Sequence, residues 1–149
     1  MQTHSNERDK AAIDEITTVF FDAFSNRNGA TPKLDGLFAL FIPEAIIIKN
    51  TGTAPEIYNL PGFIAPRKAL LTDGSLINFY EEETSERTDI FGNVAQRYSP
   101  YRKSWSAAGD DYKGAGVNVF QFVRTPVGWK ISSLAWDDEE PTRVAARRQ

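Results

Sequence analysis

Residues 113–139 read KGAGVNVFQFVRTPVGWKISSLAWDDE. Apolar and polar side chains alternate on both sides of Thr125-Pro126-Val127-Gly128, which is the pattern of half-buried β-strands. Proline and glycine between the two alternating stretches favour a tight turn. The segment therefore predicts a β-hairpin, and no other stretch says as much about the fold.

Two more strands are predicted before this hairpin, over residues 76–90 and 94–105. They flank Gly92-Asn93, a pair that adopts positive φ angles easily and so favours a two-residue hairpin turn. Further upstream, the continuous β-branched run 45–49 predicts a strand covered on both faces, and residues 56–59 predict a short strand.

The helices are predicted in the first half of the chain. Apolar residues recur at the spacing of an amphipathic helix over residues 11–24, and Asn28-Gly29 is a helix stop signal. Thr31-Pro32 is typical of an N-cap followed by a first-turn proline, which predicts a short helix through Phe41. Residues 62–71 have a helical pattern that Pro66 interrupts.

The positions of the two turns set the expected strand register. In the first hairpin, Phe91 should face Val94, Asp89 Gln96, Arg87 Tyr98 and Glu83 Arg102. In the second, Asn118, Phe120 and Phe122 should face Ala135, Ser133 and Ile131. Both faces of the sheet then carry apolar residues, so we expect helices on the concave face and a partner subunit of a homodimer on the convex face.

The amino-acid composition restricts the number of domains, the binding partners and the cellular compartment that we expect. The chain has 149 residues, of which 41% are hydrophobic, and this suits one domain. With 17 basic and 20 acidic residues there is no basic surplus, so we do not expect a nucleic-acid partner. The absence of cysteine fits a reducing compartment, and no apolar run approaches the length of a membrane span, so we expect a cytoplasmic protein.

Three strand sequences carry a family resemblance. Residues 94–101, VAQRYSPY, resemble a VA-x-x-[WY]-S-x-Y strand of a bacterial NTF2-like group. Residues 116–121, GVNVFQ, and residues 129–137, WKISSLAWD, are similar to that group's G-[IV]-N-x-[IFL]-Q and W-x-[IV]-x-S-x-x-W-[DE] strands. Together with the order of the predicted elements, they identify the chain as resembling the NTF2-like (SnoaL-like) superfamily over nearly its whole length.

The resemblance implies an α+β fold of the cystatin/NTF2-like type, in which N-terminal helices pack in a strongly curved, mostly antiparallel mixed sheet to form a cone with a pocket. We expect one such domain over residues 11–138, after a mobile segment 1–10 and before a solvated tail 139–149. The superfamily includes ketosteroid isomerases, scytalone dehydratases, polyketide cyclases and limonene-type epoxide hydrolases, as well as proteins without catalysis. The fold therefore restricts the function without fixing it.

Carboxylates are the candidates for acid–base catalysis, because the only histidine, His4, lies in the polar N-terminal segment. Arg87 and Asp89 are two residues apart on a predicted strand and so share a face. They resemble the Arg-x-Asp pair of limonene-type epoxide hydrolases, with Asp137 as a second carboxylate. The alternative is an ordinary ion pair at the sheet rim.

Other polar residues also have both a functional and a structural interpretation. The run Glu81-Glu82-Glu83 can place only alternate side chains in a pocket, and cross-strand pairing with Lys103 and Arg102 is a structural explanation for it. Candidate ligand-binding residues combine apolar surface with a hydrogen-bonding group, and they are Tyr58, Tyr98, Tyr101, Trp105 and Asn118. Each of these residues would also be normal in a hydrophobic core or an interface.

Three functions follow as hypotheses. The first is a pocket for an apolar, oxygenated small molecule, with a carboxylate base in an isomerase, dehydratase or cyclase reaction. The second is epoxide hydrolysis by Arg87 and Asp89, which requires both in one cavity. The third is a dimeric accessory protein whose cone is filled by its own side chains. No phosphate loop and no histidine or cysteine cluster is present, so no cofactor or metal is expected.

Overall fold

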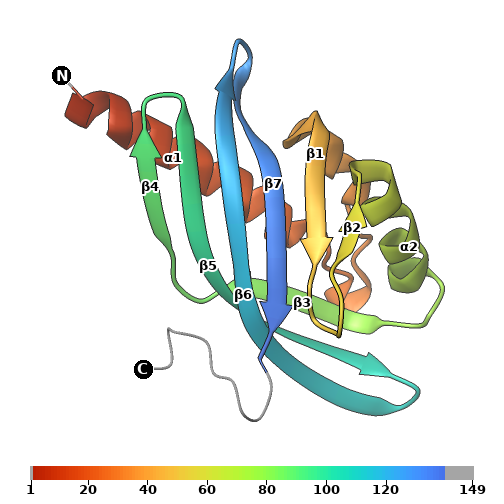
Figure 1. The fold of residues 1–149 in the computed structure, drawn as a ribbon. Coiled ribbons are helices and arrows are strands. Elements are labelled where there is room, and N and C mark those ends of the chain that lie inside the picture. The colour runs from red at the N-terminus through yellow and green to blue at the C-terminus, as the bar shows by residue number, and fades with distance from the viewer. Residues whose placement is uncertain (1, 140–149) are drawn as a thin grey trace.

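Seven strands form one strongly curved sheet with the order β2-β1-β7-β6-β5-β3, and β4 also pairs with β5 (Figure 1). The computed structural model describes residues 2–139, with side chains from Asn6 onward. Its elements are α1 (Gln2–Asp22), the 3-10 helices η1 (Arg27–Gly29) and η2 (Leu34–Ala39), β1 (Phe41–Lys49), β2 (Glu56–Tyr58), α2 (Leu60–Thr72), β3 (Ile77–Glu83), β4 (Arg87–Phe91), β5 (Val94–Ala107), β6 (Asp110–Thr125) and β7 (Gly128–Asp138). Strand β1 runs parallel to β7, and the other pairs are antiparallel.

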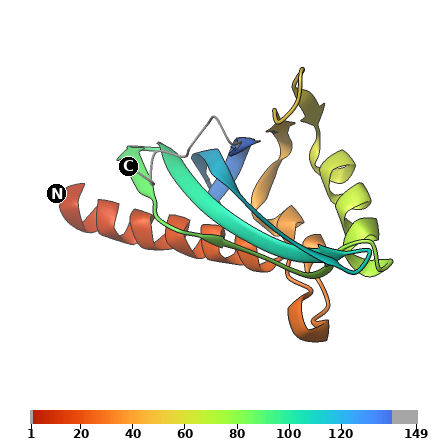
Figure 2. The ribbon, with the colours of Figure 1, turned by 90° about the horizontal axis from the view of Figure 1, so that it is seen from below.

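Helix α1 runs along the concave face of the sheet, and α2 lies at one end of it beside β1 and β2 (Figure 2). This arrangement is the predicted α+β fold, with helices packed in a curved mixed sheet. Of the predicted tail 139–149, all but Glu139 lies outside the described residues.

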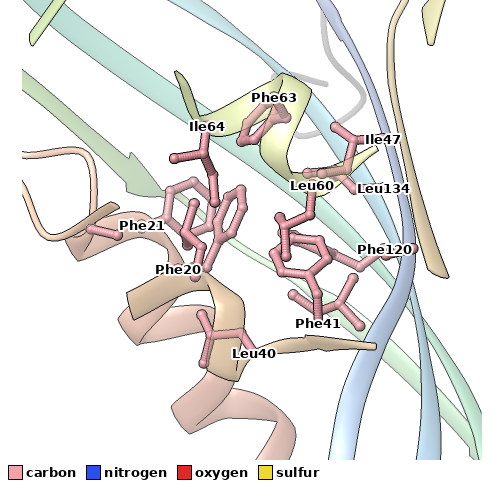
Figure 3. Packing of buried hydrophobic residues seen from close by; sticks show 14 of the residues in the cluster. Phe20, Phe21, Leu40, Phe41, Ile47, Leu60, Phe63, Ile64, Phe120 and Leu134 are labelled. Carbon is pink, nitrogen blue, oxygen red and sulfur yellow. The ribbon is translucent and has the colours of Figure 1, made fainter. Parts of the chain in front are cut away.

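The core joins both helices to the middle of the sheet. Side chains from α1, α2 and the central strands meet in one cluster (Figure 3). Phe20 of α1 is at its centre, because its ring lies 5.2 Å from that of Phe120 on β6 and 6.3 Å from that of Phe41 on β1. The contact with Phe120 is edge-to-face, which adds directional attraction to the burial of apolar area. These ring contacts hold α1 against the concave face.

Helix α1 begins at Gln2 and not at Ala11, so most of the segment expected to precede the helix is itself helical. Asp9 explains the difference. Its carboxylate accepts a hydrogen bond from Trp129 Nε1 at 3.1 Å and pairs with Arg124 at 2.7 Å. A polar sequence thus has specific partners on the sheet that its composition did not reveal.

Two further boundaries differ from expectation. The short helix predicted through Phe41 ends at Ala39 as η2, and Phe41 already starts β1, where it pairs with Ile131 of β7. Helix α2 begins at Leu60, because the side chain of Asn59 caps it by accepting the amide of Gly62 at 2.8 Å. Pro66 is tolerated inside this helix.

The register around Gly92-Asn93 is as predicted as far as Arg87, which faces Tyr98. The strand expected over residues 76–90 is then split, and Glu83 faces Tyr101, so its predicted pairing with Arg102 is wrong. Residues 84–86 oppose only Ser99 and Pro100. Proline has no N–H for the ladder, and the extra residue forms a bulge. The shift reverses the face of residues 80–83, and a second register shift between Ile77 and Tyr80 restores the expected face at Ile77.

A second bulge changes the last hairpin. Phe122 faces Ile131 as predicted, but Asn118 faces Trp136 and Phe120 faces Leu134, so the predicted pairings with Ala135 and Ser133 are wrong. The register shifts between Gln121 and Phe122, where Ser132 is the extra residue of β7 and donates its hydroxyl to the Gln121 carbonyl. Turn counting alone cannot detect such an insertion.

Candidate functional site

A cavity of about 370 Å³ lies on the concave face between the sheet, α1 and α2. Ligand sites of drug-sized molecules occupy roughly 300–1,000 Å³. Its walls are largely aromatic, with Phe20, Phe24, Phe63, Phe79 and Trp136. Its polar groups are Lys49, Tyr58, Arg67, Glu81, Lys103, Asn118 and Asp138.

Strand alternation gathers these polar groups on one face. Glu81 of β3 is the direct neighbour of Lys103 on β5, and Asn118 of β6 is the neighbour of Trp136 on β7. Asn118 also faces Ser99, which is four residues from Lys103 on β5 and so shares its face. The bulge at residues 84–86 is what turns Glu81 to this side.

Asn26, just after α1, fixes the start of β3. Its amide group donates to the carbonyls of Leu71 and Leu76 at 2.9 and 2.8 Å, and its carbonyl oxygen accepts the amide of Phe79 at 2.6 Å. One side chain therefore ties the end of α2 to the strand that carries Phe79 and Glu81. This contact orders one wall of the cavity.

Glu81 is the most perturbed carboxylate of the site. Its pKa is raised from 4.5 to about 7, chiefly by burial and also by the charge of Asp138, while the positive charges of Lys103 and Arg67 act in the opposite direction. Its side chain has no hydrogen-bond or ion-pair partner among residues 6–139. A carboxyl group that titrates near neutral pH is suited to take up and release protons there.

Asp138 is held by two groups of β5. Its carboxylate accepts the Tyr101 hydroxyl at 2.6 Å and Lys103 Nζ at 3.1 Å. Tyr101 is 1% exposed, and burial followed by the hydrogen bond to Asp138 raises the pKa of its hydroxyl. The ring lies across Gly116, where a Cβ atom would meet the hydroxyl oxygen at 2.4 Å. Tyr101 thus positions Asp138 and does not line the cavity.

Asn118 supplies a free donor. Its side chain is 3% exposed and lines the cavity, and its Nδ2 has no hydrogen-bond partner within the described part of the chain. A buried amide N–H without an acceptor costs about 1–3 kcal/mol. The group is therefore placed to bind an oxygen atom of a ligand.

Arg67 comes from α2 and lies among aromatic rings. Its guanidinium carbon is 4.2 Å from the centroid of the Phe63 ring and within 5.4 Å of those of Tyr58 and Trp136. Nη1 donates to the Phe63 carbonyl at 3.1 Å. Burial lowers the pKa of Arg67, although an arginine keeps its charge in proteins.

The sequence-based catalytic candidates lie elsewhere. Arg87 and Asp89 form a 3.8 Å pair on β4, with side chains 74% and 59% exposed, and neither lines the cavity described above. The epoxide hydrolase hypothesis requires both groups in one cavity, and this cavity contains neither Arg87 nor Asp89. Asp137 faces Val117, and its neighbour Asp138 is the carboxylate that reaches the cavity.

Of the five predicted ligand-binding residues, Tyr58 and Asn118 line the cavity. Tyr98 pairs with Arg87 on the opposite face, and Trp105 stacks on Tyr112 with 5.6 Å between ring centroids. Sequence reasoning missed Arg67 and Lys103 as site residues and explained Glu81 as a cross-strand partner. Pro100 was the available signal, because a proline inside a strand marks the break that reorients β3.

No protein-family model and no curated sequence matches this chain. Solved structures do match: an NTF2-like superfamily protein from Salmonella enterica has a TM-score of 0.75 at 14% identity, over 95% of this chain and 98% of that one. This chain has the NTF2-like fold. An NTF2-like protein with a cystatin-like fold from Novosphingobium aromaticivorans is similar, with a TM-score of 0.73 at 16% identity over 99% and 91% of the two chains.

A protein with a cystatin-like fold from Caulobacter vibrioides has a TM-score of 0.69 to this chain at 12% identity, over 91% and 92% of the two chains. At such identities the likeness concerns the NTF2-like fold and not the chemistry of its cavity. Among residues 2–139, no helix has the length and apolar character needed to cross a membrane. Nor does this part of the chain contain a cluster of three or more His, Cys, Asp or Glu placed to hold a metal ion.

Proposed function

We propose that the cavity binds an apolar small molecule with a carbonyl oxygen and that Glu81 is the general base of a proton-transfer reaction. The observation that carries the proposal is a carboxyl group with a pKa near 7 in an aromatic cavity. Bases work best when their pKa is close to the operating pH. An unpartnered donor, Asn118 Nδ2, and three cations, Lys49, Arg67 and Lys103, line the same cavity.

The reaction follows from these groups. The Glu81 carboxylate accepts a proton from the carbon next to the carbonyl, and the C–H electron pair forms an enolate. Negative charge that develops on the oxygen is stabilised by an N–H donor and by nearby positive charge. If the substrate has a β,γ carbon–carbon double bond, the enolate is a dienolate, and return of the proton to the γ carbon gives the conjugated α,β-unsaturated isomer. If the neighbouring carbon carries a hydroxyl group, its departure with the proton held by Glu81 gives water and an unsaturated product.

The alternative of a non-catalytic accessory protein required a cone filled by its own side chains. The cavity of about 370 Å³ argues that side chains of the protein do not fill the cone completely. The placement of Arg87 and Asp89 on an exposed strand leaves the epoxide hydrolase alternative without support.

Exchange of α-protons for deuterium tests the proposal. 2-Tetralone is an apolar aromatic ketone, and its exchange in D₂O is followed by NMR with and without protein. We expect the rate to increase with pH and to level off above about pH 7, as Glu81 loses its proton. Glu81→Gln should reduce the catalysed rate by about 100-fold or more.

Glu82→Gln is the matched control, because the adjacent side chain points to the opposite face and pairs with Arg102. Equal exchange rates for the wild type and Glu81→Gln would contradict the assignment of Glu81 as the base.

We also propose that the chain forms a homodimer through the convex face of the sheet. Phe91, Val94 and Val119 are large apolar residues exposed on that face, and Phe91 is 86% exposed. Apolar groups that gather on one face of a sheet favour association. Sedimentation velocity of the wild type and of Phe91→Lys tests this, and a monomeric wild type at micromolar concentration would refute it.

A further inference from the structure

The inference concerns what Arg67 binds. Most arginines of the sheet already have carboxylate partners: Arg97 pairs with Glu83 at 2.7 Å and Arg124 with Asp9 at 2.7 Å. Arg67 lines the cavity, yet no carboxylate of residues 6–139 lies within 4.0 Å of its guanidinium. Arg67 Nη1 donates to the Phe63 carbonyl at 3.1 Å, and the Tyr58 hydroxyl also interacts with the guanidinium. A guanidinium has five N–H donors, so these two contacts leave donors for a ligand.

The aromatic surroundings fix this group without neutralising it. Phe63 contacts the guanidinium and also meets Trp136, with ring centroids 5.8 Å apart, and Tyr58, with centroids 6.4 Å apart. Tyr58 in turn donates its hydroxyl to Glu56. Cation–π contacts hold a planar cation in place and leave its N–H edge available. The fork geometry of that edge matches a carboxylate.

The charges around the cavity point to the same ligand. Lys49, Arg67 and Lys103 are its cations, and Glu81 and Asp138 are its carboxylates. Asp138 is already paired with Lys103. Glu81 is not fully ionised at neutral pH, so the cavity has a surplus of positive charge in a chain whose net charge is −3.

We infer that Arg67 binds the carboxylate of an aromatic or other apolar organic acid whose hydrocarbon part lies against Phe63, Trp136 and the remaining aromatic wall. This inference rests on the proposed function, because it names the substrate class of the same cavity. The substrate is thus an apolar acid that also has a carbonyl oxygen for Asn118 and an acidic C–H for Glu81.

The test compares 2-naphthoate with 2-naphthamide, which has a similar size and no charge. Isothermal titration calorimetry measures the dissociation constant of each for the wild type, Arg67→Met and Arg67→Lys. We expect the wild type to bind naphthoate at least about 10-fold more tightly than naphthamide, and Arg67→Met to lose about 10- to 100-fold for naphthoate only. Arg67→Lys keeps the positive charge but lacks the planar guanidinium. Its affinity for naphthoate should therefore lie between those of the wild type and Arg67→Met.

Lys68→Met is the matched control, because the next side chain of α2 pairs with Asp35 at 3.0 Å and does not line the cavity. It should bind naphthoate as the wild type does. Equal wild-type affinities for the two probes, no binding of naphthoate at millimolar concentration, or unchanged naphthoate binding in Arg67→Met would each overturn the inference. If Arg67→Met does not fold, two measurements still test the inference. They are the affinities of the wild type for naphthoate and naphthamide, and the affinity of Arg67→Lys for naphthoate.

Failure of the proposed function gives a different result. Naphthoate binding by Glu81→Gln should be as tight as by the wild type or tighter, because a negative charge has been removed from the cavity. If this holds while 2-tetralone exchange is not accelerated, the anion site stands and the base assignment fails. If exchange depends on Glu81 but naphthoate is not preferred, the base assignment stands and the anion site fails.

Discussion

Replacement of Glu81 by glutamine should stabilise the ligand-free protein at alkaline pH. The pKa of Glu81 is raised from 4.5 to about 7, so between these values the folded state binds more protons than the unfolded state. Stability from this group is therefore fully present below about pH 4.5 and is lost as the pH rises to about 7. Glutamine keeps the shape of the protonated acid but has no charge to bury.

The magnitude follows from the shift. At 1.36 kcal/mol per pKa unit, a rise in pKa from 4.5 to about 7 corresponds to roughly 3 kcal/mol of stability. Water in the cavity reduces this effect, so we expect about 1–3 kcal/mol. Urea denaturation at pH 4, 6 and 8 measures the free energy of unfolding of the wild type and of Glu81→Gln, with Glu82→Gln as the control. Glu81→Gln should equal the wild type at pH 4 and exceed it at pH 8. A difference that does not change with pH, or a less stable Glu81→Gln at pH 8, would refute the reasoning.

Three other substitutions test contacts that stabilise the fold outside the cavity lining. Arg97→Met should cost about 3–5 kcal/mol in urea denaturation, because it leaves Asp14 and Glu83 without their buried partner, whereas Arg102→Met, at an exposed pair, should cost less than about 1 kcal/mol. Gly116→Ala should destabilise by about 1–3 kcal/mol and change the near-UV circular dichroism, since its Cβ would overlap Tyr101; an unchanged spectrum and stability would contradict this. The hydrogen bond from Arg124 lowers the pKa of Asp9, so that contact stabilises the fold above about pH 4 and is lost as the pH falls further. Asp9→Asn should therefore lower the melting temperature at pH 7 and have little effect at pH 3, and a loss independent of pH would contradict the role of the carboxylate.

Local signals in the sequence were enough for most of the fold. Turn residues such as Gly92 have positive φ angles in the structure, and strand alternation placed β5, β6 and β7 close to their observed bounds. The fold class followed from the order of these elements. The start of α1 was missed because the partner of Asp9 is Arg124, which is distant in the chain.

The candidate site depended on information that no local pattern contains. Tyr58 and Asn118 were predicted, because residues that combine apolar surface with a polar group are common in pockets. Glu81, by contrast, reaches the cavity only because a bulge opposite Pro100 shifts β3 by one residue. Arg67 was not considered at all, since an arginine on a helix is usually solvated.

The sequence by itself determined most of the helices, strands and turns, because propensity, side-chain alternation and turn chemistry act over a few residues. The NTF2-like fold was implied by the resemblance of three strand sequences and of the element order to that superfamily. Only the tertiary structure decided which polar groups face the cavity and which have partners. Those properties depend on strand register and on contacts between residues such as Arg67 and Trp136 that are far apart in the chain, and one inserted residue reverses a whole strand face.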